Sequence, residues 1–128
     1  MKKILFSLIL MMTMISALQA FEQLTDLQDF EKRIQKGKVI VEFYAPWCQH
    51  CPAMEENLKK FAPSKKGITV YKVNIDKSRA IVDKYGTPQV PALLYIENGK
   101  ILDGYIGLKD LKALEKDYRH YFAKGLKG

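Results

Sequence analysis

Apolar residues recur along this chain with two alternating periods, one typical of helices and the other typical of strands. The sequence TDLQ at 25–28 fits a capping box, in which Thr25 caps a helix and Gln28 reaches back to it. Apolar side chains then recur at helical spacing until Gly37, a residue type that commonly follows a helix. The segment KVIVEFYA at 38–45 is rich in β-branched and aromatic residues and predicts a buried strand.

The second half of the chain continues this alternation. We expect a helix that ends at Pro63, a strand at 68–76 and a short helix at 80–85. The segment 92–107 predicts a β-hairpin, because the Asn-Gly pair at 98–99 favours the positive φ angles of a tight turn. A last amphipathic helix follows the hairpin. The apolar positions that define the helical faces are Leu27, Phe30 and Ile34, then Met54, Leu58 and Phe61, and finally Leu108, Leu111, Leu114, Tyr118 and Phe122.

The predicted order of elements is helix, strand, helix, strand, helix, hairpin, helix, without an internal repeat, a low-complexity segment or a linker. Strands that alternate with helices indicate an α/β fold. We therefore predict a central mixed β-sheet flanked by helices on both faces.

The N-terminal segment has a different character from the rest of the chain. Two lysines precede an apolar run from Ile4 to Leu18, and the small residue Ala20 follows, which is the layout of a secretory signal peptide. The apolar run is shorter than the roughly 20 residues that a membrane-spanning helix needs. We expect residues 1–20 to be a signal peptide and 21–128 to form one domain exported to the bacterial periplasm. The alternative is an uncleaved segment that anchors the protein in a membrane.

The charge of the chain changes this picture little. The formal net charge is +7, but the lysines are spread along the sequence and form no compact basic stripe interleaved with aromatic residues. Such a distribution is typical of a solvated surface and not of a nucleic-acid-binding face. We therefore expect no nucleic-acid partner.

Candidate chemistry is concentrated in the sequence APWCQHCPAM, which holds both cysteines of the chain, Cys48 and Cys51. A pair this close cannot close a long loop, so a purely structural disulfide is a weak interpretation. At the junction of a strand and a helix, Cys48 would lie near the partial positive charge of the helix N-terminus, which favours a thiolate. His50 adds a hydrogen-bond donor, and Cys51 lies within reach. A thiolate beside a second thiol is what thiol–disulfide exchange requires.

A metal site is the competing interpretation of the same residues. Cys48, His50 and Cys51 could bind Cu(I) or Zn²⁺, for which thiolates are suitable ligands. However, three ligands within four residues cannot converge at a helix start without unwinding it, and a structural zinc ion needs a fourth ligand. We therefore expect no metal.

The residues around the cysteines also resemble a known family. The sequence VEFYAPWCQHC is similar to the active-site strand and turn of the thioredoxin superfamily, and the similarity continues through YKVNID, YGTPQVPALLYIENGK and GYIGLKDL. It covers nearly all of residues 22–122 in the order and spacing of the family. The tryptophan before the cysteines, the later proline and the hairpin make this combination far more specific than a lone Cys-x-x-Cys.

The resemblance implies a role for each matching catalytic residue. Cys48 would be the attacking cysteine, and Cys51 would be the shielded resolving cysteine. Glu42 and Lys72 match a buried acid and a lysine that help to move the proton of the resolving cysteine. His50, between the cysteines, would stabilise the Cys48 thiolate.

The resemblance also implies a substrate-binding surface made of Trp47, Val90 and Pro91. The family keeps a cis-proline at the position of Pro91, although most X-Pro bonds are trans. The backbone of Val90 would then pair with an extended substrate chain.

The sequence departs from thioredoxins at several positions. Gln49 and His50 replace the usual Gly-Pro between the cysteines, and a histidine there resembles the more oxidising sites of protein disulfide isomerase domains and DsbA. Glu56 replaces a proline that kinks the following helix in many thioredoxins, and Tyr44 replaces a frequent tryptophan. We therefore expect a thioredoxin-like fold with a straighter helix and a more oxidising site.

Together these features predict an exported thiol–disulfide oxidoreductase, monomeric and without a cofactor other than the redox-active Cys48–Cys51 pair. Its partners would be protein substrates with thiols or disulfides and a membrane redox protein that recharges the pair and sets the direction of electron flow. Two alternatives are a redox-inert binding module on the same fold and a carrier of copper or zinc.

Overall fold

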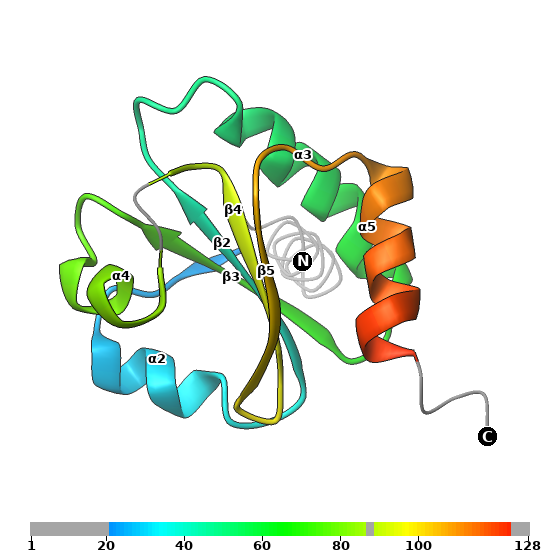
Figure 1. The fold of residues 1–128 in the computed structure, drawn as a ribbon, viewed down its shortest axis with the longest axis horizontal. Coiled ribbons are helices and arrows are strands. Elements are labelled where there is room, and N and C mark those ends of the chain that lie inside the picture. The colour runs from blue at the N-terminus through cyan, green and yellow to red at the C-terminus, as the bar shows by residue number, and fades with distance from the viewer. Residues whose placement is uncertain (1–20, 87–88, 124–128) are drawn as a thin grey trace, which may run out of the picture.

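A mixed β-sheet of five strands forms the centre of the molecule (Figure 1). The structure, a computed structural model, describes residues 21–86 and 89–123. Its strands are β1 (Glu22–Gln23), β2 (Lys38–Tyr44), β3 (Ile68–Asn74), β4 (Ala92–Glu97) and β5 (Lys100–Ile106). Its helices are α2 (Leu27–Arg33), α3 (Cys51–Phe61), α4 (Arg79–Tyr85) and α5 (Leu111–Asp117), with a 3-10 turn at Ala62–Ser64 and a π-helical turn at Tyr118–Phe122.

The strands lie in the order β1-β3-β2-β4-β5, so β2 is the central strand. β1, β3 and β2 run parallel to one another, whereas β4 and β5 are antiparallel to their neighbours. Val39, Ile40 and Val41 of β2 are fully buried, as expected for a strand covered on both faces. The register sets Glu42 of β2 opposite Lys72 of β3, which brings both residues to the same part of the sheet.

Helices cover both faces of this sheet, as the sequence predicts. Figure 1 shows α2 and α4 on one side of the strands and α3 and α5 on the other. Side chains of β2 alternate between two hydrophobic clusters, because successive residues of a strand point to opposite faces. Val41 belongs to the cluster under α2 and α4, which also contains both cysteines, and Ile40 belongs to the cluster under α3 and α5.

The hairpin is confirmed at the predicted turn. Asn98 has a φ of 51° and Gly99 a φ of 82°, the two positive angles that join β4 to β5 in a tight turn. Asn98 also accepts a hydrogen bond of 2.8 Å from the backbone N–H of Gly37 through its side-chain oxygen. The turn is therefore tied to the start of β2.

Three details of the predicted elements are wrong. Asp26, not Thr25, caps α2, because its carboxylate accepts a hydrogen bond of 2.9 Å from the N–H of Asp29. Leu108 and Leu111 were expected on the buried face of the last helix, but they are 42% and 40% exposed. Leu108 lies outside α5, which begins only after the Asp110 cap, and Leu111 is the first residue of that helix. The strand β1 was not predicted, since two residues are too few to show a period.

The predicted signal peptide at residues 1–20 lies outside the described residues. Within residues 21–86 and 89–123, the structure contains no helix with the length and hydrophobicity that crossing a bilayer requires.

Candidate active site

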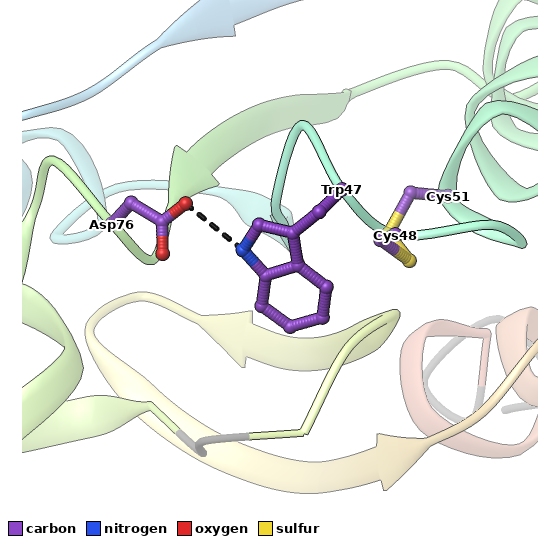
Figure 2. The surroundings of a disulfide bond; sticks show 4 residues. All are labelled: Trp47, Cys48, Cys51 and Asp76. Atoms are coloured by element: carbon purple, nitrogen blue, oxygen red, sulfur yellow. Dashed lines mark hydrogen bonds between the residues drawn. A yellow bond between two sulfur atoms is a disulfide. The ribbon is translucent and has the colours of Figure 1, made fainter.

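Cys48 and Cys51 form a disulfide at the point where the chain passes from β2 into α3 (Figure 2). Their Cα atoms are 5.5 Å apart. The turn after β2 is held by a 3.1 Å hydrogen bond from the N–H of Cys48 to the carbonyl of Ala45. Cys51 is the first residue of α3, and His50 is its N-cap. Cys48 therefore lies in the turn that leads into α3, close to the N-terminus of that helix, as the sequence pattern predicts.

Both cysteines are largely buried in this oxidised form. Cys48 is 8% exposed and Cys51 is 4% exposed, so Cys48 is the more accessible of the two by a small margin. The roles of Cys48 as the attacking and Cys51 as the resolving cysteine stay predictions. That Cys48 is accessible in the reduced protein stays a prediction.

His50 is exposed at the N-cap of α3, and its side chain makes no capping hydrogen bond. Pro52, the second residue of α3, has no backbone N–H. The helix start therefore offers one N–H fewer to a negative charge than a helix without this proline.

Trp47 lies immediately before the disulfide and is 65% exposed. Its indole N–H donates a hydrogen bond of 3.0 Å to Oδ2 of Asp76, in the loop that follows β3 (Figure 2). Asp76 is held in turn, because its backbone N–H donates to the side-chain oxygen of Asn74 at 2.9 Å. Sequence reasoning missed Asp76, although loops that follow adjacent parallel strands meet at one edge of a sheet.

The Val90–Pro91 peptide bond is cis, as the family resemblance implies. Pro91 is buried directly before β4, and Val90 packs against the hydrophobic cluster that contains both cysteines. Of the expected substrate surface, the structure thus sets Trp47 in the turn that carries the disulfide and Val90 against the same cluster.

A pocket of about 210 Å³ adjoins the disulfide. β2 and the following turn, the first turns of α3, and β3 all contribute to its wall. Glu42 and Lys72 were expected to act together with Cys51, and the pocket brings these three residues together. The lining residues are Glu42, Tyr44, Ala45, Pro46, Cys48, Cys51, Pro52, Glu55 and Lys72.

Glu42 is fully buried, and neither of its carboxyl oxygens has a hydrogen-bond partner among the described residues. Burial raises the pKa of Glu42 from its ordinary value of 4.5 to about 8, and the nearby carboxylate of Glu55 adds to this rise, against the opposing effect of Lys72 and Lys59. The group therefore titrates near neutral pH, which is the range that a proton donor or acceptor needs.

Lys72 makes its ion pair with Glu55. Its ammonium group donates to both carboxylate oxygens of Glu55, at 3.0 and 3.1 Å, and lies 4.4 Å from the centre of the Tyr44 ring. Sequence reasoning did not identify Glu55. The signal in the sequence was its position four residues after Cys51, because residues at that spacing share one face of a helix.

Helix α3 runs without interruption from Cys51 to Phe61, with Glu56 inside it. Among residues 21–86 and 89–123, no group of three or more histidine, cysteine, aspartate or glutamate side chains is placed to hold a metal ion.

Comparison with known proteins places this site in a family. The thioredoxin family model matches residues 21–120. The thioredoxin of Chlamydia trachomatis is 31% identical over 94 residues, which cover 73% of this chain and 92% of that protein. A thioredoxin domain-containing protein 5 homolog from Drosophila melanogaster is 34% identical over 89 residues, which cover 67% of this chain but only 21% of that protein.

A solved structure gives the same result. Mitochondrial thioredoxin 3 of Saccharomyces cerevisiae, in its oxidized form, superposes with a TM-score of 0.72 at 27% sequence identity, covering 78% of this chain and 94% of that one. The family match, these relatives and the bonded Cys48–Cys51 pair support thiol–disulfide oxidoreductase chemistry. The chain belongs to the thioredoxin family.

Proposed function

We propose that this protein is an exported oxidoreductase that exchanges disulfides with protein substrates through Cys48 and Cys51. One observation carries the proposal. The disulfide of these two cysteines lies at the start of α3, beside the exposed indole of Trp47, and it lines a pocket together with the buried acid Glu42. The pair supplies the electrons, the surface receives the substrate, and the pocket supplies a route for the proton.

In the reducing direction, the Cys48 thiolate attacks one sulfur of a substrate disulfide. A mixed disulfide forms, and the first substrate thiolate leaves. The Cys51 thiol then gives its proton to the ionised form of Glu42, which is the minor form at neutral pH because the pKa is about 8, directly or through water in the pocket, and the resulting thiolate attacks Cys48. The Cys48–Cys51 bond forms, the second substrate thiolate leaves, and two electrons have passed to the substrate.

The oxidising direction uses the same atoms in reverse. A substrate thiolate attacks Cys48 in the disulfide, and the sulfur of Cys51 leaves with the bonding electron pair. Glu42, protonated at neutral pH because burial raises its pKa to about 8, gives its proton to that sulfur. A second substrate thiolate then attacks the substrate sulfur of the mixed disulfide and releases Cys48 as a thiolate.

The direction of net flow depends on the partner that recharges the pair. We propose a membrane redox protein for this role. We place the exchange in the periplasm, because the N-terminal segment has the layout of a signal peptide. Standard reduction potentials of such cysteine pairs run from about −270 mV for thioredoxin to about −120 mV for DsbA. We place this protein above thioredoxin in that range, because the imidazole of His50 can stabilise the reduced form with a Cys48 thiolate.

Trapping of mixed disulfides tests this function. In a Cys51→Ser variant the resolving thiol is absent, so Cys48 should remain bonded to its substrates. Expressed with its own N-terminal segment, this variant should yield covalent complexes on non-reducing gels that disappear after reduction. A Cys48→Ser variant is the matched control and should trap none.

Two outcomes would contradict the proposal. Equal trapping by both variants would show that Cys48 is not the attacking residue. A redox-inert module would be favoured if Cys51→Ser gave no complexes and the purified protein also failed to exchange disulfides with a reduced, unfolded protein.

Fractionation of the same cells tests export. Recovery of all the protein from the cytoplasm would exclude export.

A further inference from the structure

Glu55 lies in α3 four residues after Cys51, on the wall of the same pocket. Its side chain is 21% exposed, and that of Lys72 is 14% exposed, so their contact is shielded from most solvent. Both carboxylate oxygens of Glu55 receive hydrogen bonds from Lys72, at 3.0 and 3.1 Å. The Lys72 ammonium group is therefore paired with Glu55 by charge-assisted hydrogen bonds, which are stronger than bonds between neutral groups.

Glu42 is the second acid that lines the pocket together with Lys72. The two residues are paired in register on neighbouring strands, and both face the pocket. Yet the Glu42 carboxyl group has no hydrogen-bond partner among the described residues. Lys72, which could pair with the buried Glu42, is therefore paired with the more exposed Glu55.

We propose that Glu55 is a positioning residue of the redox site, which holds the ammonium group of Lys72 away from Glu42 and so keeps the Glu42 carboxyl group able to carry the proton of Cys51. This inference rests on the proposed disulfide exchange, because the proton matters only if the Cys48–Cys51 bond opens and closes. The chemistry of Glu42 would then be set by a side chain that contacts neither sulfur.

The charges around Glu42 support this role. The charges that act on Glu42 are Glu55 and Lys59 of α3 and Lys72 of β3, and the other titratable residues in the pocket wall are Cys48, Cys51 and Tyr44. The ammonium nitrogen of Lys59 lies 3.8 Å from Oε1 of Glu55, so Glu55 interacts with both Lys59 and Lys72. Without the Glu55 carboxylate, Glu42 would be the only carboxyl group in this set with which Lys72 could pair. An ion pair between Lys72 and Glu42 would favour the charged form of Glu42.

The titration of Glu42 in the oxidised protein tests the proposal directly. Carbon-13 NMR of the side-chain carboxyl group reports its midpoint. Glu55→Gln removes the charge but keeps the size of the side chain, and it should lower the midpoint by about one pH unit or more, the usual effect of an opposite charge at close range. The control is Glu56→Gln, an exposed position on the same helix with the same change of net charge. It should leave the midpoint within about 0.2 pH units, as expected for a solvent-screened charge.

A double-mutant cycle separates the action through Lys72 from the direct repulsion between two acids. Lys72→Met keeps much of the volume and removes the cation. If Glu55 acts by holding Lys72, the effect of Glu55→Gln on the Glu42 midpoint should be at least halved in the Lys72→Met background. An equal effect in both backgrounds would overturn the proposal, as would a Glu55→Gln midpoint equal to that of wild type.

The rate of disulfide exchange supplies a second readout. The pH profile for closure of the Cys48–substrate mixed disulfide should move to lower pH in Glu55→Gln by the same amount as the Glu42 midpoint, and a profile that stays in place would count against the proposal. Failure of the proposed function looks different, because it would remove exchange in wild type while the NMR midpoints would still report on Glu55.

Discussion

The indole N–H of Trp47 donates a hydrogen bond of 3.0 Å to the carboxylate of Asp76, and this contact joins the loop after β2 to the loop after β3. It orients a side chain that is 65% exposed beside the disulfide. Exposed aromatic side chains that are held in one orientation make good anchors for a partner, because little conformational entropy is lost on binding. The bond therefore connects a residue far from the cysteines in sequence to the surface that would meet the substrate.

Asp76→Ala should free the indole without unfolding the protein. Trp47 is the only tryptophan of the chain, so its fluorescence anisotropy reports this residue alone and should fall in the variant. We expect the KM for a protein disulfide to rise about fivefold, equivalent to roughly 1 kcal/mol for the lost hydrogen bond. Turnover of a small disulfide should change less, since such a substrate contacts little of the indole.

Asp76→Asn serves as the control for this prediction, because its amide oxygen can still accept from the indole. Its anisotropy and KM should remain near those of wild type. Equal KM values for the protein substrate in wild type and Asp76→Ala would remove the hydrogen bond from substrate recognition.

Reduced protein should react with iodoacetamide at Cys48 first, with a rate that reaches its plateau below neutral pH. The cause is the position of Cys48 in the turn that leads into α3, near the unpaired N–H groups of the helix start and two residues before His50. The rate is measured against pH, and the labelled residue is identified by mass spectrometry. A midpoint near 8.5, the value of an ordinary thiol, would contradict the prediction.

The parts of the fold with a strong local signal could be predicted from the sequence. β2 and β3 are runs of β-branched and aromatic residues, and the Asn98-Gly99 pair marks its own turn. The cysteine pair was equally clear, since its spacing and its neighbours carry the chemistry. Asp26 was missed as the cap of α2 because Thr25 and Asp26 are adjacent and both residue types are good caps.

The interior of the site depends on tertiary placement and was only partly predictable. Glu42 and Lys72 were identified from the family resemblance, but the partner of Lys72 was not. Glu55 reaches Lys72 because α3 packs across β2 and β3, a relation that no local pattern records. The contact between Asp76 and Trp47 depends in the same way on tertiary structure, because it requires that β2 and β3 are parallel neighbours.

His50→Pro should make the Cys48–Cys51 pair more reducing. The substitution removes a donor that stabilises the Cys48 thiolate, so the reduced form loses stability relative to the disulfide. We expect the equilibrium constant with glutathione to shift about tenfold, or roughly 30 mV. The potential is measured by titration with mixtures of reduced and oxidised glutathione.

Gln49→Ala is the matched control, because Gln49 is also exposed and lies between the same two cysteines. Its potential should stay within about 10 mV of wild type, since no charge or donor to the thiolate is expected to be lost. A potential of His50→Pro equal to or above that of wild type would show that His50 has no part in setting the redox poise.

Glu42→Gln should alter how the stability of the oxidised protein depends on pH. The pKa of Glu42 is about 8 in the folded protein, because the carboxyl group is buried, and has its ordinary value of 4.5 when the chain unfolds. Between these values the folded state keeps a proton that the unfolded state releases. The stabilising contribution of this proton is therefore complete below pH 4.5 and is lost as the pH rises through 8.

The free energy of unfolding of wild type should consequently fall across that window, by up to about 1.4 kcal/mol per pH unit. Glu42→Gln cannot release a proton and should lack this component, so the variant should gain stability relative to wild type as the pH is raised from 5 towards 8, as expected from the linkage of proton binding to folding. Denaturation with urea at several pH values measures the difference, with the disulfide intact so that neither cysteine titrates. Glu56→Gln, which removes an exposed acid of α3, should follow the wild-type curve. If the curves of Glu42→Gln and wild type run parallel from pH 5 to 8, Glu42 does not hold its proton in the folded protein, and its role as the proton carrier of Cys51 at neutral pH fails with it.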